Sequence, residues 1–574
     1  MSQKESAPGH SSRNNESDQS NSGDPEANPE SETDPAEESD SGSDRSSKTP
    51  QGSGSEHESD SGRRTDSDTE DRSDPASEAD LNAGSGFKST GEKSPPSGSD
   101  AEYPGSDTEY TGSDTGYTGS DTEYTEGSIF RALLKLASPI ILANILHTAY
   151  QLIDTFWLGR LGAHAVAAVS LSFPILFLIL SFGGGLTLAG TIIVSHYKGA
   201  GNQRGVDFSS SQTIFIIFFV SILLAVIGYT AAGPLMQLVG AGPDILEESV
   251  NYFRVSSIGF VFMFIFFVFQ SLMRGIGNVM LPMYVILFTV FLNLVLDPLF
   301  IYGWGPLPGY GVTGAAVASV ITQGISAAIG FYIMWRGNRG IRVRFADMGI
   351  DTAWIRRMFV LGIPASLDQS TRAAGMTMMV IIVTSFGSEV VAAYGIGARI
   401  LSLVIIPALG LGIATTTLVG QNIGAAKIRR AEQTGDLVVR IAFVGLTAIG
   451  LLLFLFAEQL TAFFVPDDPQ VIRDGARFIR IMAPSFGFLG VQQVMNGTFN
   501  GAGFTTASLL ISILSLWIIR FPMAYVLSNN TALGYEGIWW AFPISNFIAA
   551  IAAFIYYKIG HWKVRAFKNR NTML

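Results

Sequence analysis

The chain divides into two parts with very different patterns of hydrophobic and polar residues. Residues 1–128 are almost entirely polar, whereas apolar runs of 18 or more residues recur from Ile129 onward. Only helices or closed barrels satisfy the backbone polar groups inside a bilayer, and uninterrupted runs of this length predict helices. We expect twelve membrane-spanning helices, at residues 130–158, 163–196, 211–233, 252–273, 281–303, 312–335, 357–386, 391–420, 436–457, 476–499, 507–528 and 536–557.

Basic residues are concentrated in every second connection between the expected helices. The segment at residues 336–357 holds six arginines, whereas the connection "GPLPGYG" at residues 305–311 holds no charge. Lys and Arg in short connections favour the cytoplasmic side of a membrane. The pattern therefore predicts a multi-pass protein of the cell membrane with both termini in the cytoplasm.

The expected helices form two similar sets of six. The stretch "GAHAVAAVSL" at residues 162–171 matches "GSEVVAAYGI" at residues 387–396, and the same offset along the chain brings Pro139 onto Pro364. Ordered matches at a nearly constant offset are not explained by the small residues that helix packing favours. Because each half holds an even number of helices, the two halves have the same topology and are related by a pseudo-two-fold axis along the membrane normal.

We therefore expect an all-α membrane protein with two six-helix lobes behind a polar tail. The N-lobe is expected at residues 129–345 and the C-lobe, with a short basic C-terminus, at residues 346–574. The long basic connection between the sixth and seventh helices marks the division between them.

Charge separates the tail from the rest of the chain. Residues 1–128 contain 31 acidic and 9 basic residues, which leaves 17 acidic and 28 basic residues in the remainder. A segment with so little apolar surface cannot offset the entropy of ordering, so we expect a disordered cytoplasmic tail. It ends in a seven-residue repeat, "GSDTEYT", "GSDTGYT" and "GSDTEYT", at residues 105–125. Its acidity is typical of a salt-loving organism, and a partner-binding or phosphorylated tail is the alternative.

Several kinds of chemistry are excluded by what the sequence lacks. The chain has no cysteine, which excludes disulfides and thiolate metal sites. It has no Gly-rich phosphate-binding loop that ends in Gly-Lys-Ser/Thr, so direct ATP-driven transport is not expected. No nucleophile or metal cluster falls at membrane depth. We therefore expect neither an enzyme, nor an organic cofactor, nor a nucleic-acid partner.

One carboxylate lies in the apolar run from Met283 to Gly303. A charge such as Asp297 at the centre of a membrane helix costs about 2.5–3.5 kcal/mol on insertion scales. Asn293 lies four residues earlier and shares its helix face, and Pro298 follows and removes one backbone donor. This combination predicts a functional site, with a structural buried acid as the alternative.

A second acid lies in the first expected helix. Asp154, His147 and Gln151 share one face of that helix, and the sixth helix supplies Ser319 and Thr322. A carboxylate in a low-dielectric cavity can carry a proton, and carboxylate, amide and hydroxyl oxygens together can hold Na⁺. Both ions therefore stay open. His147 is either a proton relay or a packed polar residue, and Asp154 is either a site residue or a hydrogen-bonded helix end.

The seventh helix carries a third acid next to a base. Asp368 and Arg372 are four residues apart, and a neutralised pair is the cheapest way to hold both charges in a membrane. They form either a structural pair or part of a C-lobe cavity. Arg399 and Arg520 have no local partner in the sequence, so we expect them to pair across helices or to lie at a cavity wall.

Four motifs carry a resemblance to a known family. "LIDTFWLGRLG" at residues 152–162, "RGIGN" at 274–278, "NLVLDP" at 293–298 and "GAAVAS" at 314–319 are similar to first-half signatures of the multidrug and toxic compound extrusion (MATE) transporters. The resemblance covers about residues 129–560. It is closest to the DNA-damage-inducible F-like branch, and the acidic tail favours a haloarchaeal origin.

The resemblance implies a cation site in the N-lobe and none in the C-lobe. Relatives of this branch would place Asp154, Asn293, Asp297 and the hydroxyl of Ser319 around a coupling cation, H⁺ or Na⁺, with the two acids and the amide as the Na⁺ ligands. The family pattern often has Thr where this chain has Ser319. The tenth helix carries amides but no acid, which argues against a second site there: Gln492, Gln493, Asn496 and Asn500.

We therefore expect a monomeric antiporter that exports amphipathic, cationic organic compounds by alternating access. A wide cavity between two lobes suits loose recognition of varied substrates. The alternative is a flippase for lipid-linked oligosaccharides or lipids. Its anionic substrates would favour cavity cations, which Arg372, Arg399 and Arg520 could supply.

Overall fold

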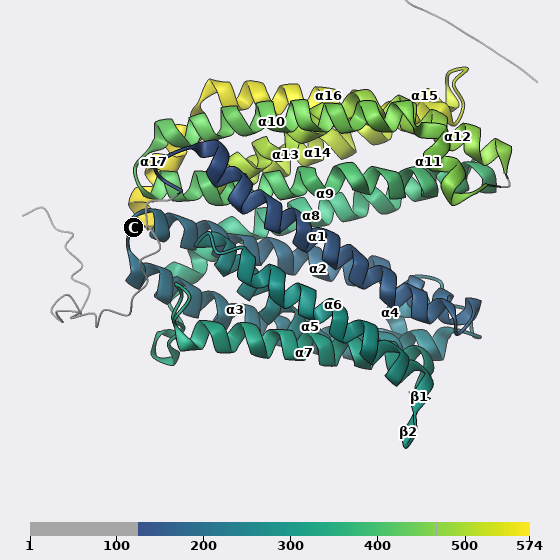
Figure 1. Ribbon diagram of the computed structural model, residues 1–574, viewed down its shortest axis with the longest axis horizontal. Coiled ribbons are helices and arrows are strands. Elements are labelled where there is room, and N and C mark those ends of the chain that lie inside the picture. Colours follow the sequence, from purple (N-terminus) through teal and green to yellow (C-terminus); the bar gives the residue numbers. More distant parts are fainter. Residues whose placement is uncertain (1–123, 467, 574) are drawn as a thin grey trace, which may run out of the picture. The chain divides into compact units, whose positions relative to one another are not determined.

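The computed structural model of the chain describes residues 124–466 and 468–573, which are almost entirely helical (Figure 1). The first six-helix set comprises the long helices α1 (Ile129–Gly159), α2 (Ala163–Gly199), α3 (Gln203–Thr230), α5 (Leu246–Gly275), α6 (Met280–Tyr302) and α7 (Gly311–Arg336), with the short helix α4 (Ala232–Leu238) between α3 and α5. The short antiparallel strands β1 (Gly303–Trp304) and β2 (Leu307–Pro308) form a hairpin between α6 and α7. The 3₁₀ turn η1 (Phe345–Asp347) leads into the second set.

The second set repeats this order with two irregular helices. It comprises α8 (Thr352–Thr384), α9 (Ser388–Gly424), α10 (Ile428–Leu455), α11 (Ala457–Phe464), α12 (Pro469–Met482), the 3₁₀ turn η2 (Ala483–Ser485), α13 (Phe486–Gly501), α14 (Thr505–Ile513), the π-helical turn η3 (Leu514–Arg520), α15 (Phe521–Asn529), α16 (Glu536–Ile559) and α17 (His561–Met573). Of the acidic tail expected at residues 1–128, residues 1–123 lie outside the described residues.

Within the described chain, ten helices are long and apolar enough to cross a membrane. They account for ten of the twelve expected spans. The seventh expected span is α8, which has the length but carries Asp368 and Arg372 in its middle. The tenth, expected as one helix over residues 476–499, is wrong in that respect. It is divided at η2, where Pro484 has no amide hydrogen to continue the helical ladder.

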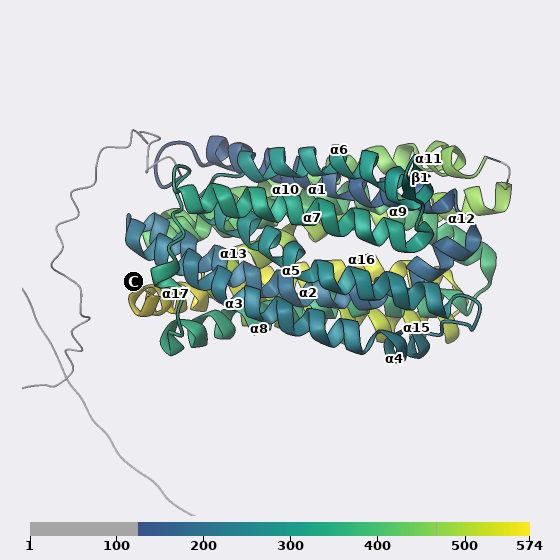
Figure 2. The same cartoon turned by 90° about the horizontal axis from the view of Figure 1, so that it is seen from below.

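The pseudo-two-fold relation between the two sets is confirmed by matching contacts at one end of the helices. This end holds α17 and the basic connections at residues 200–202, 337–351 and 425–427, and we call it the basic end (Figures 1 and 2). The opposite end holds β1 and β2, and we call it the hairpin end. At the basic end His196 Nε2 donates to Gly501 O at 2.8 Å, and Gln421 Nε2 donates to Gly275 O at 2.9 Å. His196 and Gln421 occupy equivalent positions in the repeat, so each half makes the same bond to the other.

Two glycines bring α2 and α9 into backbone contact beside these bonds. A side chain on Gly199 would overlap the carbonyl oxygen of Gln421, and one on Gly424 would overlap that of His196. These glycines are also equivalent in the repeat. The basic end is therefore closed by a reciprocal contact that only glycine permits.

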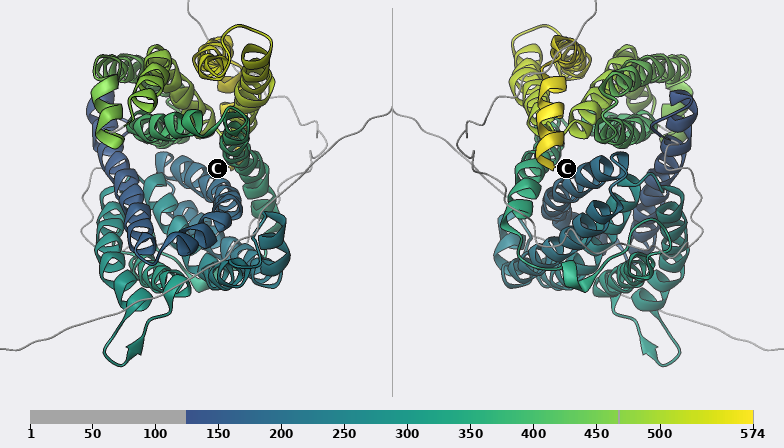
Figure 3. Two further views of the ribbon diagram at one scale, coloured as in Figure 1. Left: turned by 90° about the vertical axis from the view of Figure 1, so that its right-hand side faces the viewer. Right: turned by 90° about the vertical axis from the view of Figure 1, so that its left-hand side faces the viewer.

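The first helix of each set is partly exchanged with the other set. Leu133 and Leu136 of α1 are buried in a core with α9, α10 and α13, whereas Met358 and Leu361 of α8 are buried with α2, α3 and α5. Figure 3 shows α1, in dark blue, running along the side from one set to the other. The expected lobe boundaries at residues 129–345 and 346–574 stay a prediction, and the packing shows that helices α1 and α8 belong to both cores.

Residues 124–127 form a short N-terminal strap across the basic end. The Tyr124 hydroxyl donates to Gly277 O at 3.0 Å in the first set, and Asn422 Nδ2 of the second set donates to Tyr124 O at 3.2 Å. Lys427 pairs with Glu126 at 3.0 Å. The expected tail boundary at residue 128 stays a prediction, and within it Tyr124 and Glu126 have partners on the helices.

Candidate functional site

Asp297 and Asn293 lie side by side in the apolar helix α6. They share one face of the helix, as their spacing predicted; both are fully buried, and Asn293 Nδ2 donates to Asp297 Oδ1 at 2.6 Å. The other oxygen of each side chain, Asp297 Oδ2 and Asn293 Oδ1, is buried without a hydrogen-bond partner among the described residues. Two hard oxygen acceptors are thus left unsatisfied at membrane depth, where each costs several kcal/mol unless it is occupied.

A cavity of about 170 Å³ lies within the first set and is lined by an earlier part of α6, and we call it the first-half cavity. Asp154 lines it from α1, and its Oδ1 is buried without a partner among the described residues. The Tyr150 hydroxyl bonds Ser319 Oγ at 2.9 Å across the same cavity.

The structure brings most of the predicted residues together. His147, Gln151, Asp154 and Ser319 line the first-half cavity, and Asn293 and Asp297 lie deeper, one and two turns beyond the cavity-lining part of α6. Thr322 does not line the cavity. Its hydroxyl is buried and donates to Ala318 O at 2.7 Å within α7, which satisfies it locally.

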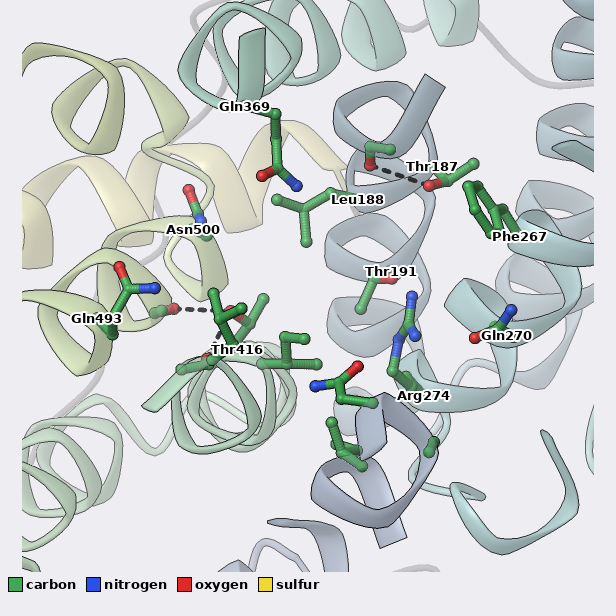
Figure 4. A pocket seen from close by; sticks show the side chains of 18 of the residues that line it. Thr187, Leu188, Thr191, Phe267, Gln270, Arg274, Gln369, Thr416, Gln493 and Asn500 are labelled. Atoms are coloured by element: carbon green, nitrogen blue, oxygen red, sulfur yellow. Dashed lines mark hydrogen bonds between the residues drawn. The ribbon is translucent and has the colours of Figure 1, made fainter. Parts of the chain in front are cut away.

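A second, larger cavity of about 310 Å³ lies between the two sets (Figure 4). We call it the central cavity. His147, Phe267, Gln270 and Ile286 line both cavities, so the two spaces are neighbours. His147 therefore stands between the central cavity and the acids of the first set.

Asp368 and Arg372 form an ion pair and also line the central cavity, so both of the geometries expected for them are present. Arg372 Nε and Nη2 contact the two carboxylate oxygens at 3.2 Å and 3.3 Å. Arg372 Nη1 also donates to Gln493 Oε1 at 2.8 Å. The pair is thus neutralised and held in place by an amide from α13.

Of the other polar residues predicted in the second set, some line the central cavity and others pack between helices. Gln493, Asn496 and Asn500 line the central cavity, whereas Gln492 does not. Arg520 lies in η3 and pairs across helices with α16, donating to Ser545 Oγ at 2.8 Å and to Asn546 Oδ1 at 2.7 Å.

Sequence reasoning missed many of the residues that line these cavities, among them residues that carry a phenol, an amide or a charge. Tyr150, Tyr252 and Gln323 line the first-half cavity, and Arg274 lines the central cavity. Arg274 lies in the motif "RGIGN", which indicates the family but not a position at a cavity. The sequence did indicate this position, because an arginine at the end of an apolar helix can turn back into the protein.

Among the described residues, no group of three or more His, Cys, Asp or Glu side chains is placed to hold a metal ion. The predicted Na⁺ site has two acids and one amide and so differs in kind from such a group. Na⁺ accepts amide, hydroxyl and carboxylate oxygens, which are the groups that Asp154, Asn293 and Ser319 offer.

Comparisons with known proteins agree with this architecture. The MatE family model matches residues 139–299 and again residues 364–526. The chain is 29% identical over 440 residues to "Probable multidrug resistance protein YpnP" of Bacillus subtilis, covering 76% of this chain and 97% of that protein. It is 28% identical over 451 residues to "Probable multidrug resistance protein NorM" of Thermotoga maritima, covering 77% and 95%.

A solved structure supports the same fold. The structure described as the outward-facing conformation of a multidrug resistance MATE family transporter superposes with a TM-score of 0.72. It is 24% identical in sequence, and the match covers 78% of this chain and 98% of that one.

Proposed function

Because the chain belongs to the MatE family, whose model matches both of its halves, we propose that it is a cation-coupled antiporter that exports amphipathic organic compounds. Its many apolar helices make it a multi-pass membrane protein. The comparisons support multidrug export and do not favour the flippase alternative. The branch within the family and the haloarchaeal origin stay predictions.

The main support for cation coupling is a group of buried oxygens in the first set that have no hydrogen-bond partner. Asp154 Oδ1, Asn293 Oδ1 and Asp297 Oδ2 are all buried without a protein partner in the described chain. A structural buried acid would be expected to have both oxygens satisfied. A proton or Na⁺ at this group would neutralise the acids and remove the cost of leaving them bare.

Alternating access follows from the geometry of the two cavities. The reciprocal glycine contact holds α2 and α9 together at the basic end, which supports a state in which the central cavity exchanges with the hairpin end. With the basic end in the cytoplasm, as the Lys and Arg pattern predicts, this is the outward-facing state. Cation binding at Asp297 then favours repacking of α1 and α6, which shrinks the space next to His147 and releases the substrate.

Coupling requires that substrate and cation disfavour one another. Such a coupling is reciprocal, since each ligand changes the affinity for the other by the same factor. His147 is the proposed link because it lines both cavities. We propose that the transporter works as a monomer without an organic cofactor, with H⁺ or Na⁺ as the coupling ion.

The proposal is tested with purified full-length protein in sealed vesicles loaded with a fluorescent dye. An inward-directed H⁺ gradient and an inward-directed Na⁺ gradient are imposed separately, and dye efflux is followed for each. We expect efflux to accelerate under one of the two gradients. Equal efflux with and without either gradient would refute cation coupling.

A further inference from the structure

Arg274 is the one cavity cation that has no partner in the described chain. It lies in the last turn of α5 and lines the central cavity, and Figure 4 shows its side chain beside Thr191 and Gln270. No hydrogen bond or ion pair joins its side chain to another described residue. The residue is only half-buried, so its guanidinium faces the cavity with its donors free.

The other charges of the central cavity cancel. Its lining contains one carboxylate, Asp368, which is paired with Arg372, and every remaining polar group is an amide, a hydroxyl or the imidazole of His147. The guanidinium of Arg274 is therefore left over, and the cavity carries a net positive charge. Protonation of His147 would only increase it.

Two buried amides add unpaired donors to the same lining. Asn144 Nδ2 on α1 and Asn496 Nδ2 on α13 are buried without hydrogen-bond partners among the described residues, as is the acceptor Asn496 Oδ1. With Arg274 on α5, the unpaired donors of the lining come from three helices and from both six-helix sets, and they outnumber this acceptor. An excess of donors matches an anionic oxygen group better than a cation.

A structural role at the helix end leaves the guanidinium of Arg274 without a partner. A cation in the last turn of a helix is stabilised by the helix dipole, typically by about 0.3–1 kcal/mol. Gly275 O next to it already accepts a bond from Gln421, and the Arg274 side chain bonds no described carbonyl. Its donors are therefore available to a ligand in the central cavity.

We infer that the central cavity binds organic anions, with Arg274 as the residue that contacts the anionic group. The fitting class has a carboxylate, sulfonate or phosphate monoester on an apolar or aromatic body. The body would lie against apolar walls from both sets, which Leu188, Phe267, Ile286, Leu409 and Ile413 provide. This inference rests on the proposed function in taking the central cavity as the substrate site, and it replaces the cationic substrates expected from the sequence.

The test is equilibrium binding to purified full-length protein in detergent, without any ion gradient. The probes are fluorescein, an anion, and rhodamine 6G, a cation built on the same ring system. Fluorescence anisotropy should show at least tenfold tighter binding of fluorescein. Arg274→Gln should weaken fluorescein binding at least tenfold without weakening rhodamine 6G, and Arg274→Lys should keep the preference for fluorescein.

A matched control lies on the same helix. Arg254 of α5 does not line either cavity and stacks over the ring of Tyr229 at 5.7 Å, so Arg254→Gln should leave both affinities unchanged. Tighter binding of rhodamine 6G to the wild type, or unchanged fluorescein binding in Arg274→Gln, would overturn the inference. Because binding needs no gradient, these outcomes are independent of the vesicle test, whose failure counts against the proposed function alone.

Discussion

The two halves of the molecule share a fold and a closing contact, but they differ at the position of the acids. At the offset that relates the two sets, Met379 takes the place of Asp154 and Arg372 takes the place of His147. Met379 is buried in the apolar core of the second set. On the helix segment that corresponds to α6, the second set has Arg520 in place of an acid, and its guanidinium is bonded to Ser545 and Asn546.

The buried acids of the two sets differ in whether their oxygens have partners. In the first set, Asp154 Oδ1 and Asp297 Oδ2 are buried without partners among the described residues. In the second set, both oxygens of Asp368 and of Asp474 accept hydrogen bonds. Satisfied acids stabilise a core, and unsatisfied ones are expected where a ligand binds. We therefore propose that cation exchange takes place in the first set alone, while the closing contact at the basic end is shared by both sets.

The largest effect is expected at the acids of the first set. Asp297→Asn and Asp154→Asn keep size and hydrogen bonding but cannot take up a cation, so gradient-driven efflux should fall at least 100-fold while the protein still folds. Vesicle efflux under the effective gradient measures this. The matched control is Asp474→Asn in the second set, a buried acid already bonded by Tyr535 and Gln470, which should keep coupled efflux.

A smaller and symmetric effect is expected at the basic end. Gly199→Ala and Gly424→Ala each place a methyl group against a backbone carbonyl of the other half, so closure is hindered and efflux should fall about tenfold in both. Gly159→Ala is the control, since Gly159 also ends a helix and has open space around it. Unequal losses at the two contact glycines would contradict the reciprocal closure.

Arg520→Gln should change stability and not coupling. The substitution leaves Ser545 and Asn546 without their donor, which costs about 1–3 kcal/mol. The thermal midpoint of the detergent-solubilised protein should therefore drop, while the surviving protein keeps its response to the gradient. Loss of coupling at an unchanged midpoint would show that the second set also takes part in cation exchange.

The smallest effect is expected at the N-terminal strap. Removal of residues 1–123 should leave the thermal midpoint and efflux unchanged, because the contacts of the strap begin at Tyr124. Removal of residues 1–127 also deletes the bonds from Tyr124 and Glu126, of which one is partly buried, and should cost about 1 kcal/mol. A larger loss in the shorter truncation would mean that the strap is not where the stabilising contacts start.

The sequence predicted those features that depend on local spacing. The four-residue spacing of Asn293 and Asp297 predicted that they share a helix face, that of Asp368 and Arg372 predicted their ion pair, and the repeat offset predicted the two sets. Residue spacing could not predict the features that depend on packing between the two halves of the chain. The exchange of α1 and α8, the approach of Arg274 to the central cavity and the docking of Tyr124 all depend on contacts between segments distant in the chain.

Prediction from the local sequence also failed at two residues, where two local preferences competed. Pro484 divides the tenth span because the apolar run hid a residue that cannot continue a helix. Thr322 shares a helix with Ser319 but turns to its own backbone, since a hydroxyl in an apolar helix can bond the carbonyl four residues earlier.

The central claim, that the first set alone holds the coupling cation, is tested most directly by measuring whether cation and substrate compete. Dye affinity of the purified protein is measured across a range of H⁺ and Na⁺ concentrations for the wild type, Asp297→Asn and Asp474→Asn. We predict that affinity falls as one of the cations rises in the wild type and in Asp474→Asn, and that it is constant in Asp297→Asn. Cation-dependent dye affinity that persists in Asp297→Asn at the wild-type level would contradict the account and leave Asp297 as a structural buried acid.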